Sequence, residues 1–336
     1  MTGSTRWLHR RGDLARDGWE SVVDDTLPGW QHTGLRIGVL DGSTALELPA
    51  GALERMVVPL EGALTVTHDG GEDAEGPTGA QSTIELAHRI GVFHGPGDVV
   101  YLGVGVTATI SGTGRVAVAE APATEQIPVQ VIRAADVPVE QRGAGAASRQ
   151  VHNFGVPGGL RAQKLIVCEV ITPSENWSSF PAHKHDQAIP GVESRLEEIY
   201  YFESDVARGL ARPEQSDPFG LFATYSSPAG EIDIAGLVRT GDVALVPYGY
   251  HGPAAAAPGY DLYYFNVMAG PDPERVWNIT DDPAHGWIRG TWNGQERDSR
   301  LPYTSAPVGD EPGAADAAGS AADASTTTTS TTENGL

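Results

Sequence analysis

The sequence predicts an all-β protein built from two copies of one barrel or sandwich of antiparallel strands. Many short segments are rich in β-branched and aromatic residues and are separated by Gly, Pro, Asn or Asp, which is typical of such strands. An internal repeat indicates the duplication, because Glu54 and Glu198 open similar segments and the strings GDVVYL and GDVALV are the same 144 positions apart. Helical periodicity is confined to short stretches such as LHRRGDLARDGW, so we expect few and short helices.

Composition divides the chain into four parts. We expect an N-terminal segment at 1–30, a first barrel at 31–145 and a second barrel at 146–305, with the string QRGAGAASRQ at the junction. Residues 306–336 contain no Lys, Arg or aromatic side chain and include a run of Ser and Thr near the end. Because such a segment cannot bury enough apolar surface to stay ordered, we expect a disordered tail.

Charge and cysteine content exclude several classes of protein. Lys and Arg number 22 against 44 for Asp and Glu, a formal net charge of -22, which argues against nucleic-acid and anionic-membrane partners. The sequence has no signal-like apolar region and no apolar stretch long enough to span a membrane, so we expect a soluble, cytoplasmic protein. The single cysteine, Cys168, excludes a disulfide framework and a Cys-based zinc site, and we expect it to be a small buried residue.

The second copy contains residues that predict a metal site. In a strand, the side chains of His183 and His185 point to one face and that of Lys184 to the other. A carboxylate at the start of LEEIYYF and a third histidine after a Pro-x-Gly turn, His251, complete the set. Three imidazole nitrogens and one carboxylate suit zinc, manganese, iron, nickel or cobalt. A lone H-x-H is more often a solvated pair, so the added glutamate and histidine carry this prediction.

These residues resemble the two motifs of the cupin barrels, and the duplication resembles a bicupin of two β-barrels or jelly rolls. H-x-H followed by EIYYF is similar to the first motif, and the string GDVALVPYGYH to the second. Over most of the body the chain resembles the 5-deoxy-glucuronate isomerase family of inositol catabolism, which is related to 5-keto-4-deoxyuronate isomerase. The strings that carry this resemblance are RQVHNF, EVITP, NWSS, HKHD, LEEIYYF, GYHGPAAAAPGYDLYYFNVMAG and HGWI.

The cupin resemblance implies which glutamate binds the metal. The motif places the ligand at the start of the strand that reads E-x-Y, which selects Glu198 and turns Glu197 away, with Glu197 as the fallback. The implied cofactor is therefore one divalent ion, zinc or manganese, held by His183, His185, Glu198 and His251.

The first barrel is expected to lack a metal. Counting back 144 positions from the four ligands gives Val39, Asp41, Glu54 and Thr107, of which only Glu54 keeps its residue type. We expect this barrel to serve packing, the shape of the substrate mouth or subunit contacts.

The resemblance implies an enzyme, an aldose–ketose isomerase that converts 5-deoxy-D-glucuronate to 2-deoxy-5-keto-D-gluconate. A divalent ion that holds both reacting oxygens would stabilise an enediolate, while a base moves the proton between the adjacent carbons. Candidate acid/base residues are Tyr200, Tyr250 and Asp186, with Glu198 if it is loosely bound. A metal-assisted hydride shift is the alternative route.

The anionic substrate requires a local cation, because the acidic body repels it at long range. Bidentate guanidinium geometry favours Arg149 as the substrate-binding residue, followed by Lys164 and Arg161. Lys184 is left out because strand alternation turns it away from the metal. A small sugar acid is thus the predicted partner, and we expect a homo-oligomer by analogy.

Three other functions fit parts of the same pattern. The chain could be a 5-keto-4-deoxyuronate isomerase, which shares the scaffold and reaction type. It could be a non-catalytic bicupin that binds metal or a sugar acid. A cupin dioxygenase would need redox-active iron and would consume oxygen.

Overall fold

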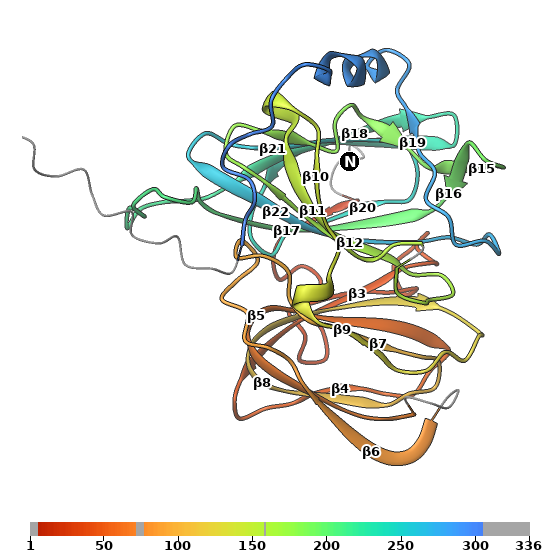
Figure 1. The fold of residues 1–336 in the computed structure, drawn as a ribbon. Helices are drawn as coiled ribbons and strands as arrows, with labels where there is room; N and C mark the ends of the chain where they lie inside the picture. Colours follow the sequence, from red (N-terminus) through yellow and green to blue (C-terminus); the bar gives the residue numbers. More distant parts are fainter. Residues whose placement is uncertain (1–5, 72–76, 158, 305–336) are drawn as a thin grey trace, which may run out of the picture. The chain divides into compact units, whose positions relative to one another are not determined.

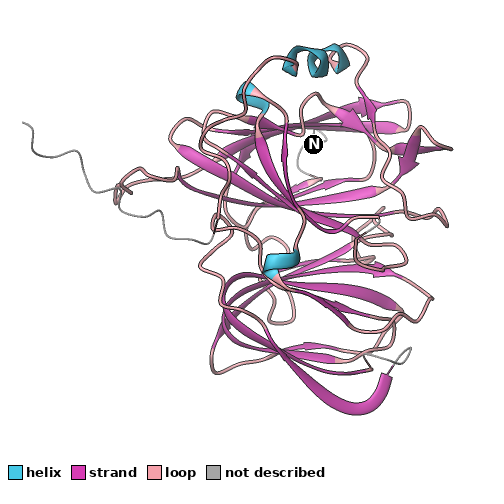
Figure 2. Cartoon of the chain, in the orientation of Figure 1, coloured by secondary structure: helices cyan, strands magenta, loops and turns pink. Residues whose placement is uncertain are grey.

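The computed structural model describes residues 6–71, 77–157 and 159–304. Strands dominate this part of the chain, as Figure 2 shows, and the prediction of an all-β bicupin is confirmed. The helices described are short 3-10 turns, η2 (Ala134–Asp136), η3 (Gly145–Ala147) and η4 (Gly286–Trp292). The predicted tail, 306–336, lies outside the described residues. None of the described helices is long and apolar enough to cross a membrane.

The first barrel is one antiparallel sheet in the order β2-β3-β8-β5-β7-β9, with β4 paired to β8 and β6 to β5 (Figure 1). The strands β5 and β8 are long, and the register between them shifts at Pro59 and Glu61, where they bend. Just beyond, Gly62 is required because a Cβ atom there would lie 2.0 Å from the Thr113 carbonyl oxygen. The strand bounds are β2 Ser21–Val23, β3 Gly34–Asp41, β4 Leu46–Leu48, β5 Leu53–Gly70, β6 Pro77–Glu85, β7 Val99–Leu102, β8 Ala108–Pro122 and β9 Gln130–Ile132.

The second barrel consists of two facing sheets, in the orders β1-β20-β17-β22-β12-β11-β10 and β19-β18-β21-β14-β23. Aromatic rings from both sheets fill its interior, with Phe202 and Phe222 at 5.3 Å between centroids. The strand β13 pairs with β21, and β15 and β16 form a separate hairpin. The strand bounds are β1 Leu8–His9, β10 Val139–Arg142, β11 Arg149–Gly155, β12 Ile166–Thr172, β13 Trp177–Ser178, β14 His183–Lys184, β15 Asp186–Ile189, β16 Glu193–Arg195, β17 Glu197–Val206, β18 Gly220–Ser227, β19 Gly230–Val238, β20 Val243–Val246, β21 Tyr250–Ala256, β22 Tyr260–Ala269 and β23 Thr280–Asp281.

Strand pairing crosses the boundaries that composition suggests. The stretch with helical periodicity near the N-terminus forms β1 and turns instead, and β1 pairs with β20 of the second barrel. The strand β2 joins the first barrel, whereas β10, which precedes residue 146, pairs with β11 of the second. The division at 1–30, 31–145 and 146–305 therefore does not follow the sheets, because edge strands are supplied by flanking segments.

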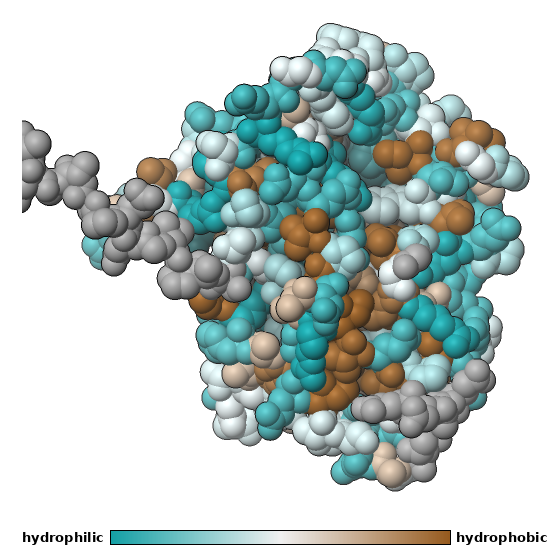
Figure 3. All heavy atoms as spheres, in the orientation of Figure 1, coloured by the Kyte–Doolittle hydropathy of each residue, from teal (hydrophilic) through white to brown (hydrophobic). Residues whose placement is uncertain are grey.

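One continuous hydrophobic core joins the two barrels. It includes Met56 and Val58 from β5, Ile199 from β17 and Phe265 from β22. A second core, with Val57 and Val100, fills the interior of the first barrel. Hydrophilic residues cover much of the face drawn in Figure 3. Alternation along β5 therefore separates the side chains between the barrels from those inside the first barrel.

Two buried glutamates fasten the barrels to each other. The carboxylate of Glu54 accepts hydrogen bonds from the consecutive amides of 163–165, at 2.8, 2.6 and 2.7 Å, and from the Tyr101 hydroxyl at 2.8 Å. In the other direction, the carboxylate of Glu197 accepts from the amides of 31–33, the closest at 2.7 Å. Each barrel thus places one carboxylate against a loop that leads into the other barrel.

The register of these strands corrects the alignment of the two copies. Arg55 pairs with the last residue of β7, and Glu198 pairs with the last residue of β20. Arg55 is therefore the structural counterpart of Glu198, and Glu54 is the counterpart of Glu197. The prediction that Glu54 corresponds to Glu198 is wrong by one residue, and such a slip moves every side chain of a strand to the opposite face.

The first barrel has a cation where the second has its inward glutamate. The Arg55 side chain is 2% exposed and pairs with Glu120 at 2.8 Å, and Arg36 lies 2.9 Å from the same carboxylate. This ion pair fills the position inside the first barrel that Glu198 fills in the second.

Replacing Glu54 by Gln should lower the free energy of unfolding by about 2 kcal/mol, because a neutral amide cannot accept all four hydrogen bonds. Chemical denaturation followed by tryptophan fluorescence measures this change. The exposed Glu61, on the same strand, supplies the control variant Glu61→Gln, which should leave stability unchanged. Equal stability of both variants would contradict the role given to Glu54.

Candidate metal centre

Three separate strands bring the predicted ligands together in the second barrel. His183 lies on β14 directly opposite His251 on β21. His185 follows β14, and its carbonyl oxygen accepts the Leu196 amide just before β17 begins. Glu198 is the second residue of β17 and faces the interior.

The cluster is tight and buried. The Nε2 atoms of His185 and His251 lie 2.9 and 3.1 Å from the same carboxylate oxygen of Glu198. The ligand atoms of these three residues all lie within 4.8 Å of one another. The His183 ring packs against the His251 ring, with centroids 4.6 Å apart, but His183 lies outside the tighter group.

Backbone carbonyl oxygens fix the tautomers of the three histidines at this site. The Nδ1 atoms of His183, His185 and His251 lie 3.3, 3.2 and 3.1 Å from carbonyl oxygens. Because a carbonyl oxygen only accepts, Nδ1 carries the proton and the Nε2 lone pair of a neutral ring is left free. This is the arrangement by which histidine ligands are oriented around a metal.

The donor set fits a metal ion. Two Nε2 atoms face one carboxylate oxygen, which requires a proton or a metal ion between them, and the contact with Glu198 accordingly raises the pKa of His185 against the effect of burial. A proton could satisfy one nitrogen, but the buried Nε2 of His251 still has no hydrogen-bond partner among the described atoms. Leaving such an atom unpaired is costly, and a divalent cation satisfies both nitrogens and the carboxylate together.

Burial and neighbouring charges set the ionisation of the cluster. Burial alone would raise the pKa of Glu198, but its contacts with His185 and His251 hold that pKa well below its usual range. Burial also lowers the pKa of His183, and His251 and His185 lower it further. The carboxylate is thus ionised and the His183 ring neutral at neutral pH, as metal ligands must be.

A set of hydroxyl groups continues from the cluster into the barrel. The Oγ atom of Ser179 lies 3.3 Å from the Tyr200 hydroxyl and 3.1 Å from the Tyr264 hydroxyl. Burial, followed by the charge of Glu198, raises the pKa of Tyr200, and burial raises that of Tyr264 to about 12. Ser179 has a φ of +47°, a left-handed conformation that non-glycine residues rarely adopt. These groups therefore present protonated hydroxyls beside the ligands.

Arg149 is a buried cation without a carboxylate partner. It is 8% exposed, its guanidinium donates to the Ala147 carbonyl oxygen at 3.0 Å, and it lies 5.6 Å from the Trp292 ring centroid. Among the described residues no carboxylate forms an ion pair with it, and burial lowers its pKa to about 10. The Tyr264 side chain acts in the opposite direction and raises the pKa of Arg149. Arg149 is thus free to pair with an anion.

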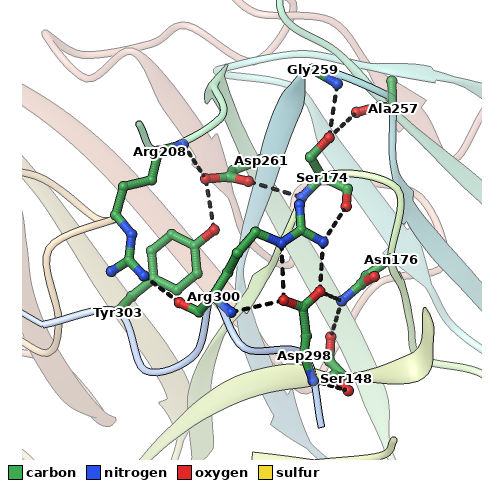
Figure 4. A network of polar contacts seen from close by, with 10 residues as sticks. All are labelled: Ser148, Ser174, Asn176, Arg208, Ala257, Gly259, Asp261, Asp298, Arg300 and Tyr303. Carbon is green, nitrogen blue, oxygen red and sulfur yellow. Dashed lines mark hydrogen bonds and ion pairs between the residues drawn. The ribbon is translucent and has the colours of Figure 1, made fainter. Parts of the chain in front are cut away.

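Residues 298–303 form hydrogen bonds with Ser148, Ser174 and Asn176, as Figure 4 shows, and these residues belong to the segments that lead to Arg149 and Ser179. The Asn176 side-chain amide donates to Asp298 at 2.9 Å and to the Ser148 carbonyl oxygen at 3.0 Å. The Asp298 amide in turn donates to the Ser148 hydroxyl at 3.0 Å. These bonds hold the start of β11 beside the loop that ends at Ser179.

Two further predicted residues lie away from the cluster. The Lys164 ammonium donates to the Asp272 carbonyl oxygen at 2.6 Å and lines a surface cavity with Arg195. The Tyr250 ring stacks on the ring of Tyr225 from the neighbouring strand β18, with centroids 5.3 Å apart. Alternation along β21 turns Tyr250 to the face opposite His251, and Lys164 lies in the loop before β12 begins. Arg161, the other cation considered, pairs with Glu125.

Asp186 lies on the face opposite that of His183 and His185. Its carboxylate pairs with the Lys184 ammonium at 2.7 Å, on the face opposite His183 and His185. The alternation that excludes Lys184 from the site thus also applies to Asp186. The position disfavours a direct acid/base role.

Sequence reasoning did not identify Ser179 or Tyr264. Ser179 lies four residues before His183 but outside the H-x-H pattern, and Tyr264 comes from the strand after His251, so neither belongs to the spacing that links the ligands. Their only signal is membership of the strings NWSS and YDLYYF, which do not reveal where the hydroxyls point.

Two antiparallel barrels, with a buried histidine–glutamate cluster in the second, define the class of this protein as a bicupin. The chain belongs to the KduI/IolB family, whose sequence model matches residues 7–288.

Relatives of known name and structure agree with this membership. The chain is 35% identical to the 5-deoxy-glucuronate isomerase of Shouchella clausii over 260 residues, which cover 77% of this chain and 88% of that protein. It is 35% identical to the enzyme of the same name from Geobacillus kaustophilus over 283 residues, or 83% and 92% of the two chains. An IolB-like protein of Salmonella typhimurium superposes with a TM-score of 0.72 at 32% identity, covering 84% of this chain and 98% of that one.

A more distant structure shares the fold alone. Oxalate decarboxylase of Lactobacillus farciminis superposes with a TM-score of 0.55 at 12% identity and covers 82% of this chain and 88% of its own. The two-barrel architecture therefore extends beyond the family.

Replacing Glu198 by Gln should abolish stoichiometric metal binding, because it removes the charge that faces two imidazoles. Glu197→Gln is the matched variant: the neighbouring glutamate faces the first barrel, so we expect lower stability but an intact metal content. Inductively coupled plasma mass spectrometry of the purified variants measures both. Metal retained by Glu198→Gln but lost by Glu197→Gln would reverse the assignment.

Proposed function

We propose that this protein is an aldose–ketose isomerase that converts 5-deoxy-D-glucuronate to 2-deoxy-5-keto-D-gluconate. The names of relatives that match over most of their length support this assignment. The observation that carries it is the combination, in one barrel, of a metal-binding cluster, the hydroxyl groups of Tyr200, Ser179 and Tyr264, and a buried Arg149 that forms no ion pair with a described carboxylate.

The proposed metal ligands are His183, His185, Glu198 and His251. The chemistry of three imidazoles and one carboxylate suits zinc or manganese. Such an ion, when bound, would polarise a carbonyl oxygen and stabilise negative charge that develops on adjacent oxygens of the sugar.

Arg149 would bind the carboxylate of the sugar acid. Its planar guanidinium can make two parallel hydrogen bonds to a carboxylate, and its burial strengthens that pairing. The chain carries a formal net charge of -22, so a local cation is needed to hold an anionic substrate. Lys164 stays a secondary candidate, which its position at a surface cavity disfavours.

The hydroxyl groups of Tyr200, Ser179 and Tyr264 would donate protons to the sugar oxygens and accept protons from them. Tyr200 lies on the same face of β17 as Glu198 and stays protonated because burial and that charge raise its pKa. It can donate a hydrogen bond to a sugar oxygen, and Ser179 can pass a proton between it and Tyr264. Proton transfer at carbon and a hydride shift both fit this arrangement.

A second candidate substrate is 5-keto-4-deoxyuronate, because the matching family model includes KduI in its description. Both substrates are sugar acids, so Arg149 and the cluster serve either reaction. A homo-oligomer and a cytoplasmic location stay predictions.

The experiment that tests the function incubates zinc- or manganese-loaded protein with 5-deoxy-D-glucuronate and follows the sugar by NMR. We expect the 2-deoxy-5-keto acid to form. Conversion of 5-keto-4-deoxyuronate instead would move the assignment to the second candidate. Tight binding without turnover of either sugar would favour a binding protein, and oxygen uptake in an electrode would indicate a dioxygenase.

Arg149→Gln should raise the KM for the sugar acid by about tenfold or more, because a charge-assisted bidentate pair is lost. Steady-state kinetics measure the change. Lys164→Gln is the matched control and should leave KM unchanged, since the Lys164 ammonium binds a backbone carbonyl elsewhere. A larger increase in KM for Lys164→Gln than for Arg149→Gln would assign the binding of the substrate carboxylate to Lys164 instead.

A further inference from the structure

A buried group of charges lies behind the histidines, on the face opposite the candidate metal centre. The Lys184 ammonium lies 2.7 Å from Asp186 and 2.7 and 2.9 Å from the two carboxylate oxygens of Glu193. All three residues are at most 8% exposed. Glu193 also accepts the Asp186 amide at 2.9 Å, so the group ties β14 and β15 to β16.

One carboxylate oxygen of this group leads back to the metal centre. Asp186 Oδ2 accepts the Gly249 amide at 3.0 Å and the Ser227 hydroxyl. The carbonyl oxygen of the same residue, Gly249, accepts the Nδ1 proton of His251 at 3.1 Å. A single residue thus connects Asp186 to the imidazole whose Nε2 faces Glu198.

The backbone at Gly249 leaves little freedom for another arrangement. Its φ of +95° lies in the left-handed region that favours glycine. A Cβ atom there would lie 2.4 Å from the Ile232 side chain and 2.8 Å from the Tyr225 carbonyl oxygen. The turn at Gly249 is therefore held by packing against Ile232 and Tyr225 and by the hydrogen bond to the Asp186 carboxylate.

We propose that Asp186 is a positioning residue that aims the His251 imidazole at the metal through Gly249, with Lys184 and Glu193 holding the carboxylate in place. This inference rests on the metal site of the proposed function. Outer hydrogen bonds of this kind orient histidine ligands, and their loss typically weakens metal binding 10- to 100-fold. Asp186 would then act on metal affinity without touching the sugar.

The competing explanation is that the group only fastens the β15–β16 hairpin. In that case its loss would lower stability without altering the geometry around a bound ion. The experiment therefore needs a spectroscopic readout of that geometry as well as an affinity.

The test compares the full-length protein with Asp186→Asn. Zinc affinity is measured by competition with a chromophoric chelator, and the ligand geometry by the visible absorption of the Co²⁺-loaded protein. We expect Asp186→Asn to bind zinc about tenfold more weakly and to shift the Co²⁺ bands. Ser227→Ala, which removes one hydrogen bond to the same carboxylate oxygen, should weaken zinc binding about threefold and keeps the test open if Asp186→Asn fails to fold.

Glu120→Gln is the matched control, because Glu120 is a buried carboxylate paired with arginines inside the first barrel. It should lose stability but keep zinc affinity and the Co²⁺ spectrum. Wild-type affinity and spectrum in both Asp186→Asn and Ser227→Ala would overturn the inference. If the wild-type protein binds no divalent metal, the metal site and this inference fail together. If it binds metal but isomerises neither sugar, only the proposed function fails.

Discussion

The convergence of two imidazole nitrogens on one oxygen of Glu198 is the constraint on which the site depends. His185 lies between β14 and β15 and His251 lies on β21, yet both Nε2 atoms approach the same carboxylate oxygen in a buried interior. Their Nδ1 protons are committed to backbone carbonyls. In the proposed function a shared cation satisfies both nitrogens, and the hydroxyls and Arg149 of the same barrel act around it.

Strand β17 links this site to the joining of the two barrels. Glu197 points between the barrels and binds the amides of 31–33, while Glu198 points inward. In the first barrel, Glu54 likewise binds backbone amides of a loop that leads into the other barrel, but Arg55 occupies the inward position. Duplication thus kept the contact that joins the barrels, and the two interiors differ in charge.

The sequence predicted the fold, because strand alternation and the repeat follow from local rules. Of the four predicted ligands, His185, Glu198 and His251 lie close together in the structure and His183 lies outside that group. Alternation places His183 and His185 together, and the E-x-Y string selects Glu198 over Glu197. The repeat could not reveal a one-residue difference in register, since Glu54 aligns equally well with Glu197 or with Glu198. Ser179 depends on a left-handed turn and on rings from distant strands, which no spacing encodes.

X-ray diffraction from crystals grown with zinc, recorded on both sides of the zinc absorption edge, tests the central claim most directly. We expect one anomalous peak inside the second barrel, about 2.0–2.2 Å from the Nε2 atoms of His185 and His251 and from a Glu198 oxygen. A peak elsewhere, with His185 still hydrogen-bonded to Glu198, would contradict it.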